Sequence, residues 1–89
     1  MLAEKLRLGQ LVISQSGRDE GKYFFIVGFP KEGYLLLANG KERKISSPKL
    51  KKIKHIKKLN IVDEEIVNKL DSGEEITDAS LRRKITSYL

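Results

Sequence analysis

The residues of this chain best suited to chemistry lie in a short loop bounded by two glycines, Gly17-Arg18-Asp19-Glu20-Gly21. Glycine reaches the positive φ angles of tight turns at little steric cost, so Gly17 and Gly21 allow the backbone to reverse. The Arg18 guanidinium can fork to a phosphate or stack on an unpaired base. Asp19 suits a structural role, accepting backbone amides in an Asx turn. The spacing predicts a loop that presents Arg18 to an anion; the alternative is a pair of Arg18 with Asp19 or Glu20.

Positive charge is concentrated in the first two thirds of the chain. Residues 1–60 hold fourteen Lys and Arg against five Asp and Glu, whereas residues 61–89 hold four against seven. Lys41 to Lys58 contains nine basic residues and one acid, Glu42. Such a surface attracts polyanions and releases their counterions; the alternative is a solvated surface that serves only solubility. The candidate phosphate contacts are Ser14, Arg18, Lys22, Lys41, Arg43, Lys44, Lys49, Lys51, Lys52, Lys54, Lys57 and Lys58. The first choices among them are Arg18, Lys22, Arg43, Lys44, Lys49 and Lys51.

The composition argues against several functional classes. The chain has no cysteine and one histidine, so we expect neither a metal site nor a cofactor. No nucleophile and base stand in a recognisable arrangement, which argues against an enzyme with a small-molecule substrate. Apolar runs such as Tyr34 to Ala38 are far shorter than the roughly 20 residues of a membrane helix. Met1 to Leu6 lacks the apolar core of a secretory signal. We therefore expect a cytoplasmic protein with no membrane partner.

Two short strands are expected on either side of the glycine-bounded loop. Leu11 to Ser14 and Lys22 to Val27 are rich in β-branched and aromatic residues, and Gln15 to Gly21 between them is turn material. Gly28 to Gly33 then breaks the second strand. Phe29 in that breaking segment is the best candidate to stack on a base, because most other aromatic residues must enter the small core.

A second hairpin is expected further along the chain. Tyr34 to Ala38 has the composition of a strand, and Asn39-Gly40 is the dipeptide most typical of a two-residue type I′ turn. This turn predicts a return strand over Lys41 to Ile45. Pro48 ends that strand, because proline cannot donate a hydrogen bond to a sheet.

The segment after Pro48 has two interpretations. Leu50, Ile53 and Ile56 recur every three residues, which suits a helix or a 3₁₀ turn. Lys54 to Lys57 could instead form a closing strand. We favour a turn over Pro48 to Lys52 followed by that strand.

Two helices are expected at the C-terminus. Asp63 is a suitable N-cap, Glu64 and Glu65 suit the positive end of a helix dipole, and Ser72-Gly73 ends the first helix. Thr77 or Asp78 caps the second. The apolar face of this second helix consists of Leu81, Ile85, Tyr88 and Leu89.

The strands carry more apolar residues than one sheet face can bury. Leu11, Val12 and Ile13 alternate between the two faces of a strand, so both faces need cover. A five-stranded barrel would bury one set in its interior. We expect Leu81, Ile85 and Leu89 to cover the other set.

The residues resemble a known family. Gly9 to Val27 looks like a KOW motif, the glycine-centred strand-loop-strand element of ribosomal proteins and of a class of transcription elongation factors, with Gly21 in the place of the motif glycine. Asn39 to Ile56 is similar to the matching segment of small bacterial KOW-containing RNA-binding proteins, which in turn resemble the large-subunit ribosomal protein fourteen-e. The resemblance covers residues 8–58, and more loosely Thr77 to Ile85.

The resemblance implies a mainly β fold, in which a small SH3-like β-barrel is packed by one or two short C-terminal helices. It implies a single domain over residues 1–89, with the barrel at about 8–58 and a helical extension at about 62–89. It also implies a noncatalytic, monomeric protein that binds RNA, in particular ribosomal RNA or the large ribosomal subunit.

Two further points follow from the resemblance. His55 would touch RNA or help to close the barrel, whereas a lone histidine is more often simply packed. The alternative function is an adaptor that contacts a transcription or translation complex mainly through protein. Salt dependence of binding separates the two functions, because only the RNA binder releases many counterions.

Overall fold

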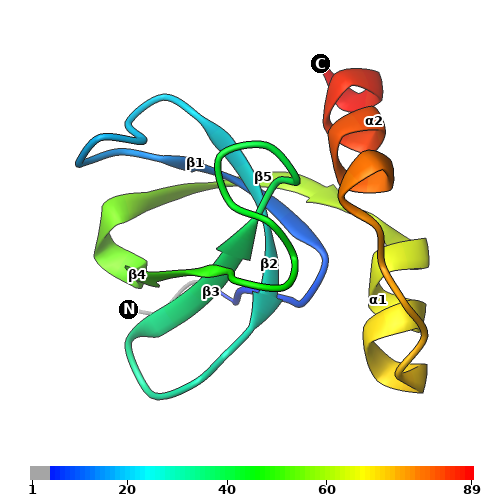
Figure 1. Ribbon diagram of the computed structural model, residues 1–89. Coiled ribbons are helices and arrows are strands. Elements are labelled where there is room, and N and C mark those ends of the chain that lie inside the picture. The colour runs from blue at the N-terminus through cyan, green and yellow to red at the C-terminus, as the bar shows by residue number, and fades with distance from the viewer. Residues whose placement is uncertain (1–4) are drawn as a thin grey trace.

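The computed structural model describes residues 5–89 and contains five strands followed by two helices (Figure 1). The expectation that residues 1–6 carry no secretory signal lies largely outside the described residues. The strands are β1 (Gln10–Ser14), β2 (Tyr23–Gly28), β3 (Tyr34–Ala38), β4 (Lys49–Lys52) and β5 (Ile56–Val62). A 3₁₀ turn, η1 (Ile53–His55), joins the last two strands, and the helices are α1 (Glu64–Ser72) and α2 (Asp78–Tyr88).

The strands form one antiparallel sheet in the order β4-β3-β2-β1-β5. Irregularities in register at Gln10/Val12 and Ile26/Gly28 increase the local twist, and the sheet curls strongly (Figure 1). Within the described residues β4 and β5 are edge strands that do not pair with each other, so the sheet stays open. The fold is therefore mainly β with two C-terminal helices, as the sequence predicts at this level.

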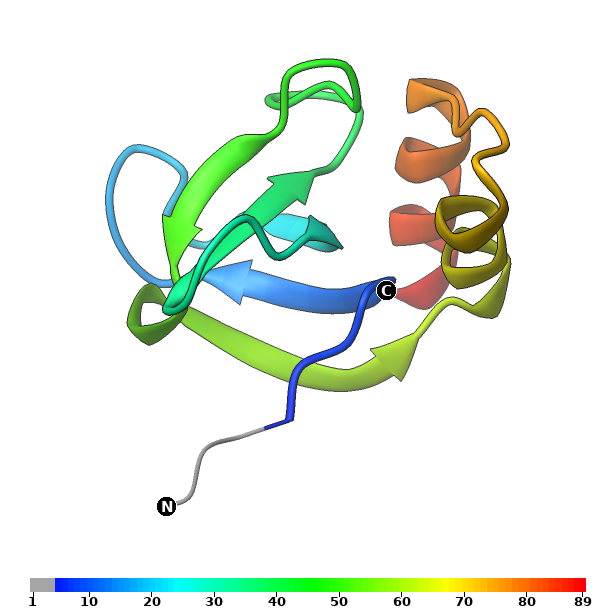
Figure 2. The same cartoon turned by 90° about the horizontal axis from the view of Figure 1, so that it is seen from below.

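Both faces of the sheet are buried, as the adjacent apolar residues of the strands predict. One cluster joins Val12, Phe24 and Leu35 on the inside of the curl with three further residues, Ile26, Leu37 and Ile56. The opposite cluster contains Leu11, Phe25, Ala38, Ile66, Ile76 and Leu81, and so includes residues of both helices. The two helices lie together on one side of the sheet (Figure 2) and cover this second face.

The helix ends follow the local capping signals. The Asp63 carboxylate accepts a hydrogen bond from the Ile66 N–H at 2.9 Å, and Gly73 ends α1 at a φ of 76°. Thr77, the first of the two candidate caps, accepts from the Ser80 N–H at 3.1 Å and starts α2. Both predicted helices are therefore confirmed, with their N-caps at Asp63 and Thr77.

The predicted return strand over Lys41 to Ile45 is wrong. The Asn39 side-chain oxygen accepts from the N–H groups of Lys41 and Arg43, both at 3.0 Å, so the chain coils back on itself. The Ile45 N–H donates to the Asp78 carboxylate at 2.8 Å and is not free for a sheet. Residues 39–48 therefore form a long loop and not a two-residue hairpin.

The expectations for residues 48–58 also need correction. Lys49–Lys52, expected in a turn, is the strand β4, which pairs with β3 directly after Pro48. The expected closing strand begins at Ile56, after η1, and continues to Val62. The sheet thus extends beyond residue 58, the expected end of the barrel.

The apolar face of α2 is shorter than predicted. Leu81 is fully buried and Ile85 is half-buried against the same cluster. Leu89 is 67% exposed, so its predicted packing on the sheet is wrong. The last helical turn is held by Tyr88 instead, whose hydroxyl donates to the Asp63 carboxylate at 2.7 Å and whose ring meets the edge of Phe25.

Candidate nucleic-acid interface

The β1–β2 loop is closed by backbone hydrogen bonds at its base. The Gly21 N–H donates to the Ser14 carbonyl at 2.8 Å, and the Ser14 N–H donates to the Lys22 carbonyl at 3.0 Å. Gly17 and Gly21 have φ angles of 81° and 87°, the left-handed region in which a side chain is strained. The structure therefore needs glycine at both positions of this loop, as the sequence predicts.

Asp19 fixes the β1–β2 loop through contacts of its side chain. Its Oδ1 accepts from the Ser14 hydroxyl at 2.7 Å and from the Lys51 ammonium at 3.0 Å, and the Lys49 ammonium lies 3.7 Å from Oδ2. Burial alone would raise the pKa of Asp19, but the Ser14 and Lys51 hydrogen bonds and the two lysine charges hold it below its usual value. Asp19 thus organises the loop as predicted, although through side chains and not as an Asx turn.

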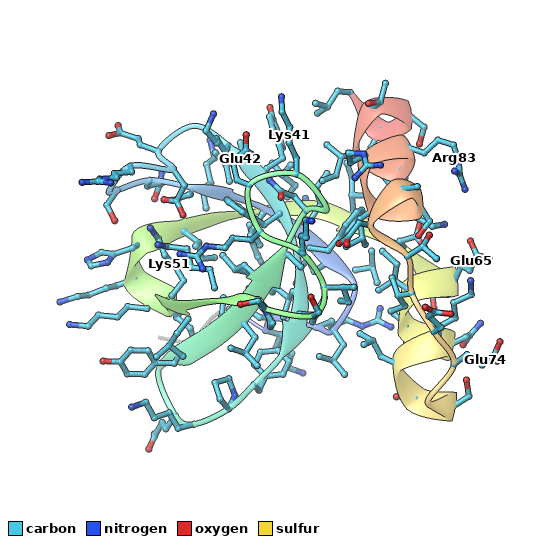
Figure 3. The ribbon with its side chains drawn as sticks, in the orientation of Figure 1. Lys41, Glu42, Lys51, Glu65, Glu74 and Arg83 are labelled. Atoms are coloured by element: carbon cyan, nitrogen blue, oxygen red, sulfur yellow. The ribbon has the colours of Figure 1, made fainter. Side chains whose placement is uncertain are left out.

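Two predicted phosphate contacts lie inside this anchor. Ser14 is 1% exposed and Lys51 is 7% exposed, and the Lys51 ammonium also donates to the Ser16 carbonyl at 2.7 Å. Lys51 lies at the end of the sheet remote from the helices (Figure 3). Because the polar atoms of both side chains already have internal partners, we correct their role from phosphate contact to support of the β1–β2 loop.

Four of the six first-choice residues meet at the surface beside this anchor. A hollow of about 240 Å³ is lined by Arg18 and Lys22 from the β1–β2 loop, Arg43 from the 39–48 loop, and Lys49 from the start of β4. Asp19 and Glu42 complete its lining. Within residues 5–89 neither Arg18 nor Arg43 has a carboxylate within 4 Å. We call this surface the basic hollow.

Glu42 ties the 39–48 loop to β2. Its carboxylate accepts from the Asn39 amide at 2.8 Å and lies 3.6 Å from the Lys22 ammonium, while the same amide donates to the Tyr23 carbonyl. Burial raises the pKa of Glu42, but the Asn39 hydrogen bond and the charges of Lys22 and Lys41 outweigh it, so Glu42 stays ionised at neutral pH. Glu42 was not among the predicted site residues. The only local signal for its contact with Asn39 was its place three residues further along the chain.

The remaining predicted basic residues lie outside the basic hollow. Lys41 and Lys44 are exposed on the 39–48 loop beside it, and Figure 3 shows Lys41 and Glu42 close together at the tip of this loop. Lys52, Lys54 and the half-buried His55 lie at the end of β4 and in η1, followed by Lys57 and Lys58 on β5. The His55 carbonyl accepts from the Gln15 N–H at 2.8 Å, so η1 supports the start of the β1–β2 loop. Phe29 is 47% exposed and also lies outside the basic hollow.

Residues 5–89 show no sign of a metal centre or of a membrane span. No three His, Asp or Glu side chains in this range are placed to hold a metal ion together. In the same part of the chain, both helices are too short and too polar to cross a membrane. No protein-family model and no curated protein matches the chain.

Proposed function

We propose that this protein is a noncatalytic RNA-binding protein that acts on ribosomal RNA, with the basic hollow as its phosphate-binding surface. The observation that carries the proposal is that one hollow is lined by two stretches of the chain, residues 18–22 with Arg18 and Lys22 and residues 43–49 with Arg43 and Lys49. The two stretches come together only in the folded chain, where they give the hollow four positive charges against the carboxylates of Asp19 and Glu42. Such a surface suits a polyanion with several phosphates in a row.

The four side chains differ in how freely they reach a ligand. Arg18 and Arg43 are exposed and can fork to phosphate oxygens, which a lysine cannot do. The Lys22 ammonium lies 3.6 Å from Glu42 and that of Lys49 lies 3.7 Å from Asp19. The Lys22–Glu42 pair is partly exposed, and an ion pair of this length at a surface contributes little, so a phosphate can compete for the Lys22 ammonium. The Asp19 carboxylate is buried, so Lys49 stays paired with it and adds its charge to the basic hollow from there.

The finer fold belongs to the same proposal. An open, strongly curled sheet of five antiparallel strands, with a glycine loop between β1 and β2, is compatible with the SH3-like barrel that the KOW resemblance implies. The Asp19 anchor then has a clear purpose: it fixes the loop so that Arg18 faces outward. Binding would lose little conformational entropy, because the loop is ordered before RNA arrives.

A salt titration with matched variants tests the function. We expect the affinity for a fluorescent RNA hairpin taken from ribosomal RNA to fall steeply between ~50 and ~200 mM salt. Arg18→Ala and Arg43→Ala should each weaken binding and lower the salt slope by about one. Lys69→Ala is the matched control, because it removes the same charge from α1, outside the basic hollow.

Crosslinking in cells identifies the RNA. We expect ribosomal RNA to dominate the sequences recovered with the wild-type protein, and the Arg18→Ala variant to recover less. Absence of ribosomal RNA from the wild-type sample would contradict the proposal. Binding that is insensitive to salt and to both arginine substitutions would favour the adaptor function instead.

A further inference from the structure

A second, larger hollow lies between the 39–48 loop and α2. It has a volume of about 340 Å³. Its lining residues are Lys22, Tyr23, Asn39, Lys41, Glu42, Arg82, Ile85 and Thr86. We call it the helix hollow, because three of these residues come from α2. Its volume is within the range typical of small-ligand sites.

The helix hollow has apolar walls and a positive rim. Tyr23 and Ile85 are half-buried and pack partly against the core, so each has both a fixed and an accessible part. Lys22, Lys41 and Arg82 supply three positive charges against the single carboxylate of Glu42. An aromatic surface beside cations is the combination that proteins use for a base and its phosphate.

The Arg82 guanidinium is held in place. It donates to the Gly40 carbonyl at 2.6 Å, which ties α2 to the 39–48 loop beside the helix hollow. The Asp78 carboxylate ties the same loop a second time, through the Ile45 N–H. A site built in this way on a helix and a fixed loop keeps its shape without a ligand.

The two hollows share a wall. Lys22 and Glu42 line both of them, and the ion pair between these side chains, 3.6 Å long and partly exposed, separates one from the other. The basic hollow, where an RNA backbone would lie on Arg18 and Arg43, is therefore next to the helix hollow. A nucleotide of such an RNA that is unstacked from its neighbours could pass the Lys22–Glu42 pair and enter the helix hollow.

We propose that the helix hollow receives one unpaired nucleotide of the bound RNA. The base lies against Tyr23 and Ile85, and its phosphate lies on Lys41 and Lys22. This inference rests on the proposed RNA-binding function and adds a preference for RNA in which one base is unpaired. It also gives α2 a role in binding besides covering the sheet.

The test compares two RNAs and two bulky substitutions. The RNAs are a perfect duplex and the same duplex with one bulged nucleotide, both measured by fluorescence anisotropy. We expect the wild-type protein to bind the bulged RNA about tenfold more tightly, the effect of one stacked base. Thr86→Trp fills the helix hollow and should remove this preference, while binding of the perfect duplex is retained. Ser87→Trp, on the next position of α2 and outside the hollow, should leave it unchanged.

A pair of charge substitutions provides a second measurement. Lys41→Ala should weaken bulged RNA more than duplex RNA, because its ammonium lies at the rim of the helix hollow. Arg83→Ala, which removes the same charge from the side of α2 that points away from the sheet (Figure 3), should affect both RNAs equally. Circular dichroism of each variant confirms that it is folded.

The outcomes separate this inference from the function on which it rests. If Arg18→Ala weakens both RNAs but Thr86→Trp leaves the bulge preference intact, or the wild type shows none, the inference is overturned and the RNA-binding function stands. If the helix hollow receives a protein side chain instead of a nucleotide, the inference is likewise overturned and the RNA-binding function stands. If neither RNA binds, the proposed function fails, and the inference about the helix hollow fails with it.

Discussion

The backbone of Gly40 lies directly against the first turn of α2, so close that a Cβ at Gly40 would overlap the Asp78 carbonyl group. Gly40 also has a φ of 78°, in the left-handed region. Two constraints therefore require glycine here, one from the turn and one from the helix. The contact brings together residues 38 positions apart and fixes the 39–48 loop against α2.

Gly40→Ala should lower the free energy of unfolding by about 3 kcal/mol or more, because overpacking adds to the cost of a positive φ. Gly33→Ala is the matched control: Gly33 has a φ of 84°, but beyond its chain neighbours no atom lies within 4 Å of the place a Cβ would take. It should lose only about 1 kcal/mol, the cost of the backbone angle. Urea denaturation measures both variants. Equal losses would mean that α2 yields to the new methyl group.

Leu81→Ala should destabilise the protein by about 3 kcal/mol, because Leu81 is fully buried in the cluster beneath the helices. Leu89→Ala, on the same helix but 67% exposed, should change stability by no more than about 0.5 kcal/mol. Removal of residues 78–89 should destabilise more than either, because it uncovers Leu11, Phe25 and Ala38. The melting temperatures of the three variants test these expectations. An unchanged value for the truncated chain would contradict the role of α2 in covering this face of the sheet.

The features that were predictable from sequence depend on neighbouring residues. The Asp63 cap and the Gly73 stop of α1 act within one helical turn, so the local pattern contains all the information needed. The Asn39-Gly40 turn failed because its outcome depends on Asp78, far along the chain, which takes the Ile45 N–H. A local signal that favours a strand was overridden there by a tertiary contact.

In the candidate site, β4 also shows a tertiary contact that overrides a local sequence signal. Alternation along a strand predicts that only half of its lysines share a face, but hydrophobicity would turn Leu50 inward and Lys51 outward. The structure has the reverse: Leu50 is 49% exposed, and Lys51 is buried opposite Leu35. The cause is Asp19, whose buried carboxylate needs a cation. No pattern within β4 contains that requirement.

Asp63→Asn should remove part of the pH dependence of stability. Burial alone would raise the pKa of Asp63, but hydrogen bonds from the Ile66 N–H, Tyr88 and Lys84 hold it below its usual value. The folded state therefore binds protons less readily than the unfolded state, so this stabilisation is present above the unfolded pKa, near 3.8, and is lost as the pH falls through the folded value. Asparagine can still accept from the Ile66 N–H through its oxygen and so still caps α1. Its amide nitrogen cannot accept from the Tyr88 hydroxyl or the Lys84 ammonium, so the charge and these two hydrogen bonds are lost together.

At pH 7 we expect Asp63→Asn to cost about 2 kcal/mol, and the difference from the wild type to shrink as the pH falls below the unfolded pKa of Asp63, as a hydrogen-bonded charge predicts. Asp71→Asn is the control, because Asp71 is exposed on the same helix. Thermal unfolding at several pH values measures both variants. A deficit of constant size across the acidic range would show that the ionised Asp63 carboxylate contributes nothing.

Lys51→Met should separate the support of the β1–β2 loop from the binding surface. Removal of the cation leaves the Asp19 carboxylate buried without its closest charge partner, so we expect a loss of about 3 kcal/mol in unfolding free energy. Lys52→Met, an exposed neighbour on β4, should have almost no effect on stability. The double variant Asp19→Asn/Lys51→Met should recover much of the loss, because it removes the charge that lacked a partner. Arg18→Ala should retain full stability and lose only RNA affinity. Denaturation and fluorescence anisotropy together therefore show whether a side chain supports the loop or binds RNA. If Lys51→Met is as stable as Lys52→Met, the Asp19–Lys51 pair does not hold the loop, and Lys51 becomes a candidate phosphate contact once more.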